Sequence, residues 1–139
     1  MIAVEESGDK GRGVFARKRF RPGELIERCP VIILNSAECE RIEPTILGMY
    51  CFRWGAEAKE VAVVLGYGSI YNHSYRPNAD FNPVLEDNAM EFVALRDIER
   101  GEEITINYNG LPEDQSPLWF SGGQWGWITE MDRRESRAA

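Results

Sequence analysis

Residues 66–78 read Gly-Tyr-Gly-Ser-Ile-Tyr-Asn-His-Ser-Tyr-Arg-Pro-Asn, and they place a polar pair directly after an apolar run. Asn72 and His73 are hydrogen-bonding residues, and the Pro77-Asn78 dipeptide that follows favours a turn. The pattern predicts a pair of polar side chains presented where a strand ends. Taken alone, a hydrogen-bonded loop asparagine and a half-buried histidine are the simpler explanation.

A second segment lies near the N-terminus, where residues 10–15 read Lys-Gly-Arg-Gly-Val-Phe. Glycines two positions apart, just before an expected strand, let the backbone approach a ligand closely and direct amide groups at it. An ordinary hairpin turn is the alternative for Gly11 and Gly13.

A third segment, residues 100–108, reads Arg-Gly-Glu-Glu-Ile-Thr-Ile-Asn-Tyr. Strand alternation puts Ile104, Ile106 and Tyr108 on one face, so the tyrosine shares a side with two core residues while its hydroxyl needs a partner. A core tyrosine with a solvated hydroxyl at the end of a strand is the simpler alternative.

In this order, G-R-G-V-F-A, N-H-S-x-x-P-N and G-E-E-I-T-I-N-Y resemble the SET domain of S-adenosylmethionine-dependent protein lysine methyltransferases. The resemblance runs from about residue 4 to residue 120, and the chain is most similar to short viral and bacterial members. It implies a mostly β fold, a β-clip of small curved sheets with one or two short helices. It also implies a C-terminal pseudoknot that brings Asn72 and His73 beside Tyr108. Residues 1–120 would form the domain, and residues 121–139 an extension whose last ten residues fray.

The pattern of apolar runs and turn residues predicts the individual elements. A capping box at Asn35 and Glu38 predicts a helix of one or two turns that ends before Pro44. Turns are expected at 21–24 and 99–102. The expected strands are 2–5, 13–17, 24–33, 50–54, 61–65, 80–82, 90–95 and 103–107.

The resemblance also implies site residues. The backbone groups that would cradle the methionyl end of the cofactor belong to Lys10, Gly11, Arg12 and Gly13. Asn72 and His73 would hold its amino group and adenine, largely through main-chain contacts and the Asn72 amide. Tyr108 matches the catalytic tyrosine of the family and also borders the cofactor.

On the substrate side, the resemblance places Tyr50 and Tyr108 along a lysine channel. Ile106 stands where the family often has phenylalanine or tyrosine, and a hydroxyl there tends to restrict the product to monomethyl-lysine. Its absence predicts that methylation continues beyond the first methyl group. The zinc-binding tail of many members is missing, so no metal is expected. Trp119 and Phe120 would supply the aromatic lid instead, or would simply pack on the core.

These residue types suit methyl transfer from a sulfonium, which needs a neutral, desolvated amine in line with the leaving sulfur. A narrow aromatic tunnel admits only the lysine ε-nitrogen and its ring faces suit a cationic amine. Desolvation beside a positive sulfonium lowers the lysine pKa from about 10.4. An ordinary tyrosine pKa of about 10 makes Tyr108 a poor general base, so we expect it to orient and stabilise the reacting groups.

The chain has 139 residues with 16 basic and 23 acidic side chains, so its net charge of −7 disfavours direct nucleic-acid binding. A basic, lysine-bearing protein or peptide such as a histone tail is the expected partner, although acidic surfaces also serve solubility. The sequence shows no apolar run long enough to predict a membrane span and no leader pattern that would predict secretion. We therefore expect an intracellular location, cytoplasmic or nuclear. The oligomeric state stays open, with a homodimer as one option.

Cysteine and histidine counts exclude other chemistries. Cys29, Cys39 and Cys51 lack C-x-x-C spacing, so we expect reduced, buried thiols and no disulfide framework. His73 is the only histidine, which excludes a His-rich metal centre. No G-x-S-x-G motif supports a serine hydrolase. The remaining alternative to an enzyme is a non-catalytic β-clip module that binds a peptide or the cofactor.

Overall fold

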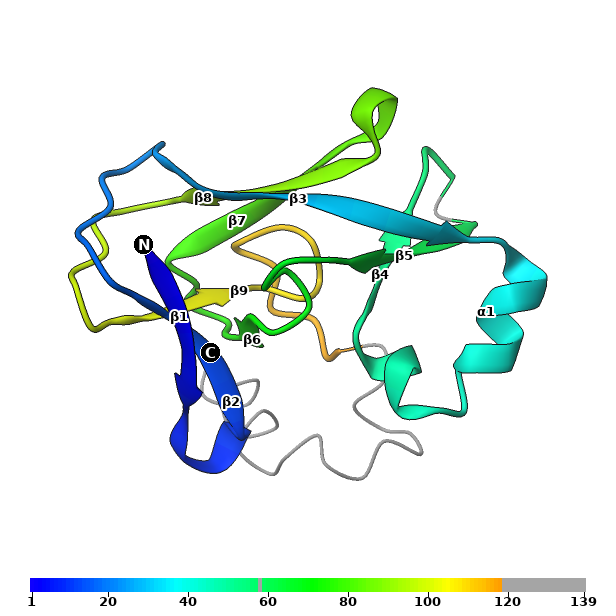
Figure 1. Ribbon diagram of the computed structural model, residues 1–139, viewed down its shortest axis with the longest axis horizontal. Coiled ribbons are helices and arrows are strands. Elements are labelled where there is room, and N and C mark those ends of the chain that lie inside the picture. Colours follow the sequence, from blue (N-terminus) through cyan, green and yellow to red (C-terminus); the bar gives the residue numbers. More distant parts are fainter. Residues whose placement is uncertain (58, 119–139) are drawn as a thin grey trace.

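The computed structural model describes residues 1–57 and 59–118, and this part of the chain is mostly β (Figure 1). Its strands are β1 (Ile2–Glu6), β2 (Arg12–Ala16), β3 (Leu25–Leu34), β4 (Cys51–Trp54), β5 (Glu60–Val64), β6 (Asn72–His73), β7 (Ala79–Val84), β8 (Ala89–Ala94) and β9 (Glu103–Ile106). Its helices are α1 (Ser36–Ile42) and the 3-10 turns η1 (Gly8–Lys10), η2 (Ile46–Met49) and η3 (Leu85–Asp87). The predicted mostly β class is confirmed.

The strands form two sheets, ordered β1-β2-β9-β6 and β4-β5-β3-β8-β7. The β1–β2 hairpin lies at one end of the molecule and α1 at the other, with β3 running between them (Figure 1). Neighbouring strands are antiparallel except for β6 and β9, which are parallel. Every strand expected from the sequence is present within about two residues of its predicted ends, whereas the two-residue strand β6 was not predicted.

The predicted capping box starts α1. The Glu38 N–H donates to Asn35 Oδ1 at 2.9 Å, and the Asn35 N–H donates to Glu38 Oε1 at 3.0 Å. The helix ends at its C-cap Glu43, directly before Pro44, which has no N–H to continue the helical hydrogen bonds. The turns at 21–24 and 99–102 are also present, each closed by a backbone hydrogen bond of 3.0 Å.

A buried cluster joins the two sheets. Its largest fully buried side chains are Tyr71, Phe20, Phe92, Met90, Ile98, Ile104 and Ile106. The three cysteines are free thiols, as expected, but only Cys29 is buried. Cys39 and Cys51 are half-buried, because α1 buries none of its residues and β4 is an edge strand. The expectation of buried thiols was therefore wrong for these two.

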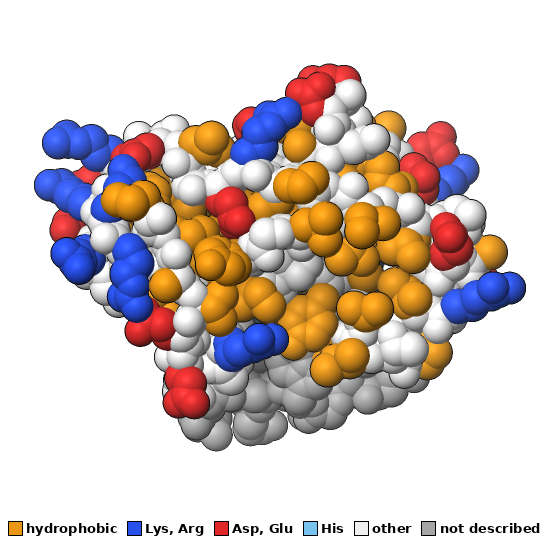
Figure 2. Space-filling view, viewed as in Figure 1, with side chains coloured by type: hydrophobic (Ala, Val, Ile, Leu, Met, Phe, Trp, Pro, Cys, Tyr) orange, Lys and Arg blue, Asp and Glu red, His pale blue; other side chains and the backbone are white. Residues whose placement is uncertain are grey.

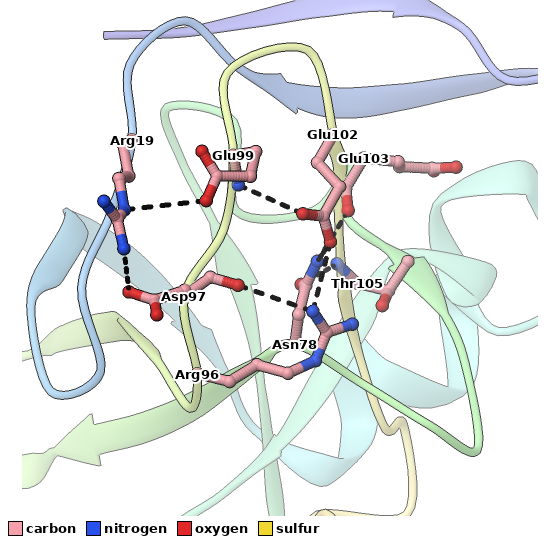
Figure 3. A network of polar contacts seen from close by, with 8 residues as sticks. All are labelled: Arg19, Asn78, Arg96, Asp97, Glu99, Glu102, Glu103 and Thr105. Atoms are coloured by element: carbon pink, nitrogen blue, oxygen red, sulfur yellow. Dashed lines mark hydrogen bonds and ion pairs between the residues drawn. The ribbon is translucent and has the colours of Figure 1, made fainter.

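Asn78 fixes the start of β9 beside the segment that follows β6, and Figure 3 shows this network. Its Oδ1 accepts the Thr105 N–H at 2.9 Å. Its Nδ2 donates to the Glu103 carbonyl at 2.8 Å and to Glu102 Oε2 at 3.2 Å. Arg96 donates to the same Glu102 oxygen at 3.2 Å. Asn78 is 2% exposed, so these hydrogen bonds replace the ones that its amide would make with water.

One face of the molecule carries hydrophobic side chains along its middle and charged ones mainly around its margin (Figure 2). Several exposed charges form ion pairs, such as Arg17 with Glu5 and Arg19 with Asp97. Exposed pairs of this kind stabilise a fold little. None of the helices in residues 1–57 and 59–118 has the length and apolar character of a membrane span.

Candidate active site

The parallel pairing of β6 with β9 assembles the site. Asn72 pairs with Thr105 and His73 with Ile106, and the Ser74 N–H then donates to the Ile106 carbonyl at 2.9 Å. The segment after β9 therefore lies against the polar pair, although more than 30 residues separate them along the chain. The predicted juxtaposition of Tyr108 with the pair is present.

Tyr108 is held at both ends. Its backbone N–H donates to His73 Nδ1 at 3.0 Å, and the two rings lie 5.2 Å apart between centroids. Its hydroxyl donates to the main-chain carbonyl of Tyr71 at 2.6 Å. The hydroxyl proton is thus directed at a carbonyl.

His73 is neutral and almost fully buried, with 4% of its surface exposed. Because Nδ1 accepts the Tyr108 N–H, the ring proton lies on Nε2, which has no hydrogen-bond partner among the described residues. Lys10 Nζ donates to the His73 carbonyl at 3.0 Å. Burial, and secondarily the Lys10 charge, lower the His73 pKa to about 3.

This burial predicts acid sensitivity. The unfolded chain takes up a proton at His73 near pH 6.5, whereas the folded chain resists it until about pH 3. The free energy of unfolding should fall as pH drops through this window, by up to about 1.4 kcal/mol per pH unit. Urea unfolding between pH 7 and 5, above the ordinary carboxylate range of about 4, measures it. His73→Gln should abolish the slope, and a slope that persists in that variant would contradict the assignment.

Asn72 is fixed by the protein itself. Its Nδ2 donates to the Arg12 carbonyl at 2.8 Å and to Glu103 Oε2 at 2.7 Å. Both amide hydrogens are therefore engaged, and the side chain can offer a ligand only its oxygen as an acceptor. Ser7 Oγ donates to the other Glu103 oxygen at 2.6 Å. Sequence reasoning missed Glu103, which contacts Asn72, and Ser7, which contacts Glu103. Only the pairing of β2, β9 and β6 brings these residues together.

Gly13 lies inside β2, and the strand predicted over residues 13–17 began at this residue. A Cβ at this position would overlap Glu103 Oε2 and lie 2.9 Å from Asn72 Nδ2. A glycine leaves room here for the Asn72–Glu103 pair, which occupies the space that a side chain would take. Gly11, with φ of 76°, forms the turn that leads into the strand.

A pocket of about 350 Å³ opens next to Tyr108. It is lined by Met49, Tyr50, Cys51, Phe52, Arg53, Ser69, Tyr71, Phe81, Pro83, Tyr108, Asn109, Gly110 and Pro117. The two edge strands of the five-stranded sheet, β4 and β7, both contribute, and Phe52 and Phe81 meet edge to face at 5.1 Å. The pocket therefore has aromatic rings on several sides.

Tyr50 and Tyr108, predicted from the sequence to border one channel, line the same pocket. Ile106 is fully buried in the core and is absent from the described lining. Trp119 and Phe120 lie outside the described residues. Sequence reasoning missed Phe52, whose place on an edge strand depends on sheet order.

Comparison with known proteins agrees with this geometry. The family described as SET domain matches residues 11–109. A Schizosaccharomyces pombe relative, "Histone-lysine N-methyltransferase, H3 lysine-37 specific", is 32% identical over 120 residues, which cover 86% of this chain and 76% of the relative. Human "Histone-lysine N-methyltransferase 2B" is 30% identical over 123 residues, 83% of this chain but 4% of that protein.

A solved structure shows the same fold. It is a Plasmodium falciparum protein described as a candidate histone methyltransferase, with 31% sequence identity and a TM-score of 0.61. The match covers 78% of this chain and 96% of that one. The family match spans more than half of the chain and includes Asn72, His73 and Tyr108. The chain belongs to the SET-domain family of protein lysine methyltransferases.

Proposed function

We propose that this chain transfers methyl groups from S-adenosylmethionine to the ε-amine of lysine in a basic protein. The observation that carries the proposal is the position of Tyr108. It hydrogen-bonds to His73, a candidate cofactor residue, and to Tyr71 in the aromatic pocket. One residue therefore joins the candidate cofactor residues to the candidate lysine channel.

The residues around Asn72 fit the proposed cofactor. Because both Asn72 amide hydrogens are engaged, its oxygen is the atom offered to a ligand, and an ammonium group is a suitable donor. The backbone of residues 10–13 and the main chain of His73 would hold the remainder. When bound, S-adenosylmethionine supplies a methyl group activated by a positively charged sulfur.

The pocket suits the side chain of lysine. Ring faces attract a cationic amine, and their apolar surface disfavours water around it. Desolvation lowers the pKa of an ammonium group and so favours the neutral amine that attacks a methyl group. Tyr108, whose hydroxyl donates to the Tyr71 carbonyl, lines this pocket and would orient the amine.

A basic substrate fits the net charge of −7. Both signs of charge alternate around the margin of the face in Figure 2, so the attraction arises from the whole molecule rather than from one acidic patch on that face. Histone-like proteins are the substrate class that we propose, which places the enzyme in the nucleus or another intracellular compartment.

Incubation with methyl-labelled S-adenosylmethionine and a pool of basic proteins tests the proposal. We expect label on lysine residues, located by mass spectrometry. Calorimetry with the cofactor, combined with this transfer assay, separates an enzyme from a binding module. Cofactor binding with no transfer to any protein would favour a non-catalytic binding module instead.

The degree of methylation is a separate prediction. In the SET family a hydroxyl two residues before the catalytic tyrosine tends to restrict the product to monomethyl-lysine, and Ile106, at this position in the core, carries none. We therefore expect dimethyl- or trimethyl-lysine on a good peptide substrate. Product masses at saturating cofactor measure this, and product that stays strictly monomethylated would contradict it.

A further inference from the structure

An acidic side chain of β3 points into the molecule. The β3–β8 register shifts between Leu25 and Glu27, which leaves Ile26 as the extra residue of a β-bulge. Ile26 packs against the core, and Glu27, the next residue, contacts the inner residue Tyr71. Bulges re-aim side chains and are frequent beside active sites. Glu27 lies on the same face of β3 as the buried Cys29, two residues further on, and the bulge lets Ile26 pack against the core beside it.

The two oxygens of Glu27 hold the two ends of one segment. Oε1 accepts the Tyr71 hydroxyl at 2.9 Å, and Oε2 accepts the Tyr67 backbone N–H at 3.0 Å. Burial, with a smaller contribution from Glu27, raises the Tyr71 pKa, so this hydroxyl stays protonated and remains a donor. We refer to Glu27, Tyr67 and Tyr71 as the Glu27 clamp.

Gly66 shows that the fold keeps space for this carboxylate. A Cβ at Gly66 would overlap Glu27 Oε2, and the φ of 64° lies in the left-handed region that disfavours other residues. At Gly66 the loop between β5 and β6 therefore lies so close to Glu27 of β3 that no side chain would fit between them.

The clamped segment forms part of the pocket. Ser69 and Tyr71 line it, and the Tyr71 carbonyl accepts the Tyr108 hydroxyl at 2.6 Å. Ser69 Oγ also lies 3.0 Å from the carbonyl of Tyr50, the second tyrosine of the pocket. A shift of residues 67–71 would therefore move the anchor of Tyr108 and the Tyr50 side of the pocket together.

We propose that Glu27 is a positioning residue for methyl transfer, acting through the Tyr67–Tyr71 segment on the hydroxyl of Tyr108 and on the lysine pocket. Glu27 does not itself line the pocket, and its described hydrogen bonds go to Tyr67 and Tyr71 rather than to Tyr108. The inference rests on the proposed function, because it assigns Glu27 a role in the reaction of that site. A carboxylate suits the role because it offers two acceptor oxygens to two donors.

Three variants test the clamp. Glu27→Ala removes both acceptors, and misplacement of reacting groups predicts a fall in kcat of about 10- to 100-fold. Glu27→Gln keeps one acceptor, and its amide can donate to the Tyr71 hydroxyl, so kcat should return to within about threefold of wild type. Tyr71→Phe breaks one of the two bonds but keeps the ring stacked on Phe92, and should lower kcat about 3- to 10-fold.

The measurements are kcat at saturating peptide and cofactor, the calorimetric cofactor Kd, and the folded fraction from circular dichroism. Glu91→Gln is the matched control, since it removes a carboxylate of β8 that pairs with Arg28 on the surface. We expect wild-type kcat in this control and an unchanged cofactor Kd in all variants.

The outcomes separate the two proposals. If the wild-type chain is active and Glu27→Ala has the same kcat per folded molecule, the positioning role of Glu27 is overturned while the proposed function stands. If Glu27→Ala does not fold, wild-type kcat in Tyr71→Phe would overturn it. A wild-type chain that binds the cofactor but transfers no methyl group would overturn the proposed function, and the clamp with it.

Discussion

Tyr108→Phe is expected to lower kcat by about 10²–10³-fold, the usual cost of removing one preorganised polar group from an active site. The variant loses the hydroxyl that donates to the Tyr71 carbonyl at 2.6 Å. It keeps the backbone N–H that donates to His73, so the ring should stay in place. Turnover with labelled cofactor and a lysine peptide at saturation is the measurement.

The role assigned to Tyr108 also predicts two properties that this variant should keep. Its thermal unfolding should remain close to wild type, because the ring still packs in its partly buried position. Its cofactor Kd should also change little, since Asn72 and its partners are untouched. Full activity in a folded Tyr108→Phe enzyme would remove the tyrosine from the catalytic machinery.

Gly13→Ala is expected to weaken cofactor binding about 10- to 100-fold, the cost of disturbing one or two buried hydrogen bonds. The added methyl group would overlap Glu103 Oε2 and crowd Asn72 Nδ2. Both atoms end side chains that can move, so the fold should survive while the Asn72 oxygen loses its orientation. Calorimetric titration with S-adenosylmethionine measures the change.

Gly23→Ala is the control for this experiment. A Cβ at Gly23 meets no atom within 4 Å, but its φ of 84° makes alanine strained. It should lower stability by about 1–2 kcal/mol and leave the cofactor Kd unchanged. Equal cofactor affinity in Gly13→Ala and wild type would show that Gly13 serves the strand and not the site.

Local sequence determined the elements of this protein. Strand alternation predicted the buried positions Ile104 and Ile106, because successive side chains of a strand face opposite sides. The capping box at Asn35 determined where α1 begins, since both of its hydrogen bonds lie within four residues. Two turns followed from their glycine and proline positions.

The ordered motifs also indicated which residues meet. Asn72, His73 and Tyr108 were expected to come together from the family resemblance, and the parallel β6–β9 pairing brings them together. No local pattern predicted β6 itself. Two residues are too few to show a period, and a parallel pair forms only when distant segments are already in register.

Tertiary structure alone decided the partners that complete the site. Ser7 and Glu103 are 96 residues apart, and Glu27 and Tyr71 are 44 apart, so nothing in the local sequence connects them. Alternation places Glu27 on the face of the buried Cys29, but it does not show which donors the carboxylate meets there, and the bulge at Ile26 depends on the pairing of β3 with β8. Periodicity reports one strand at a time, whereas these contacts depend on which strands lie side by side.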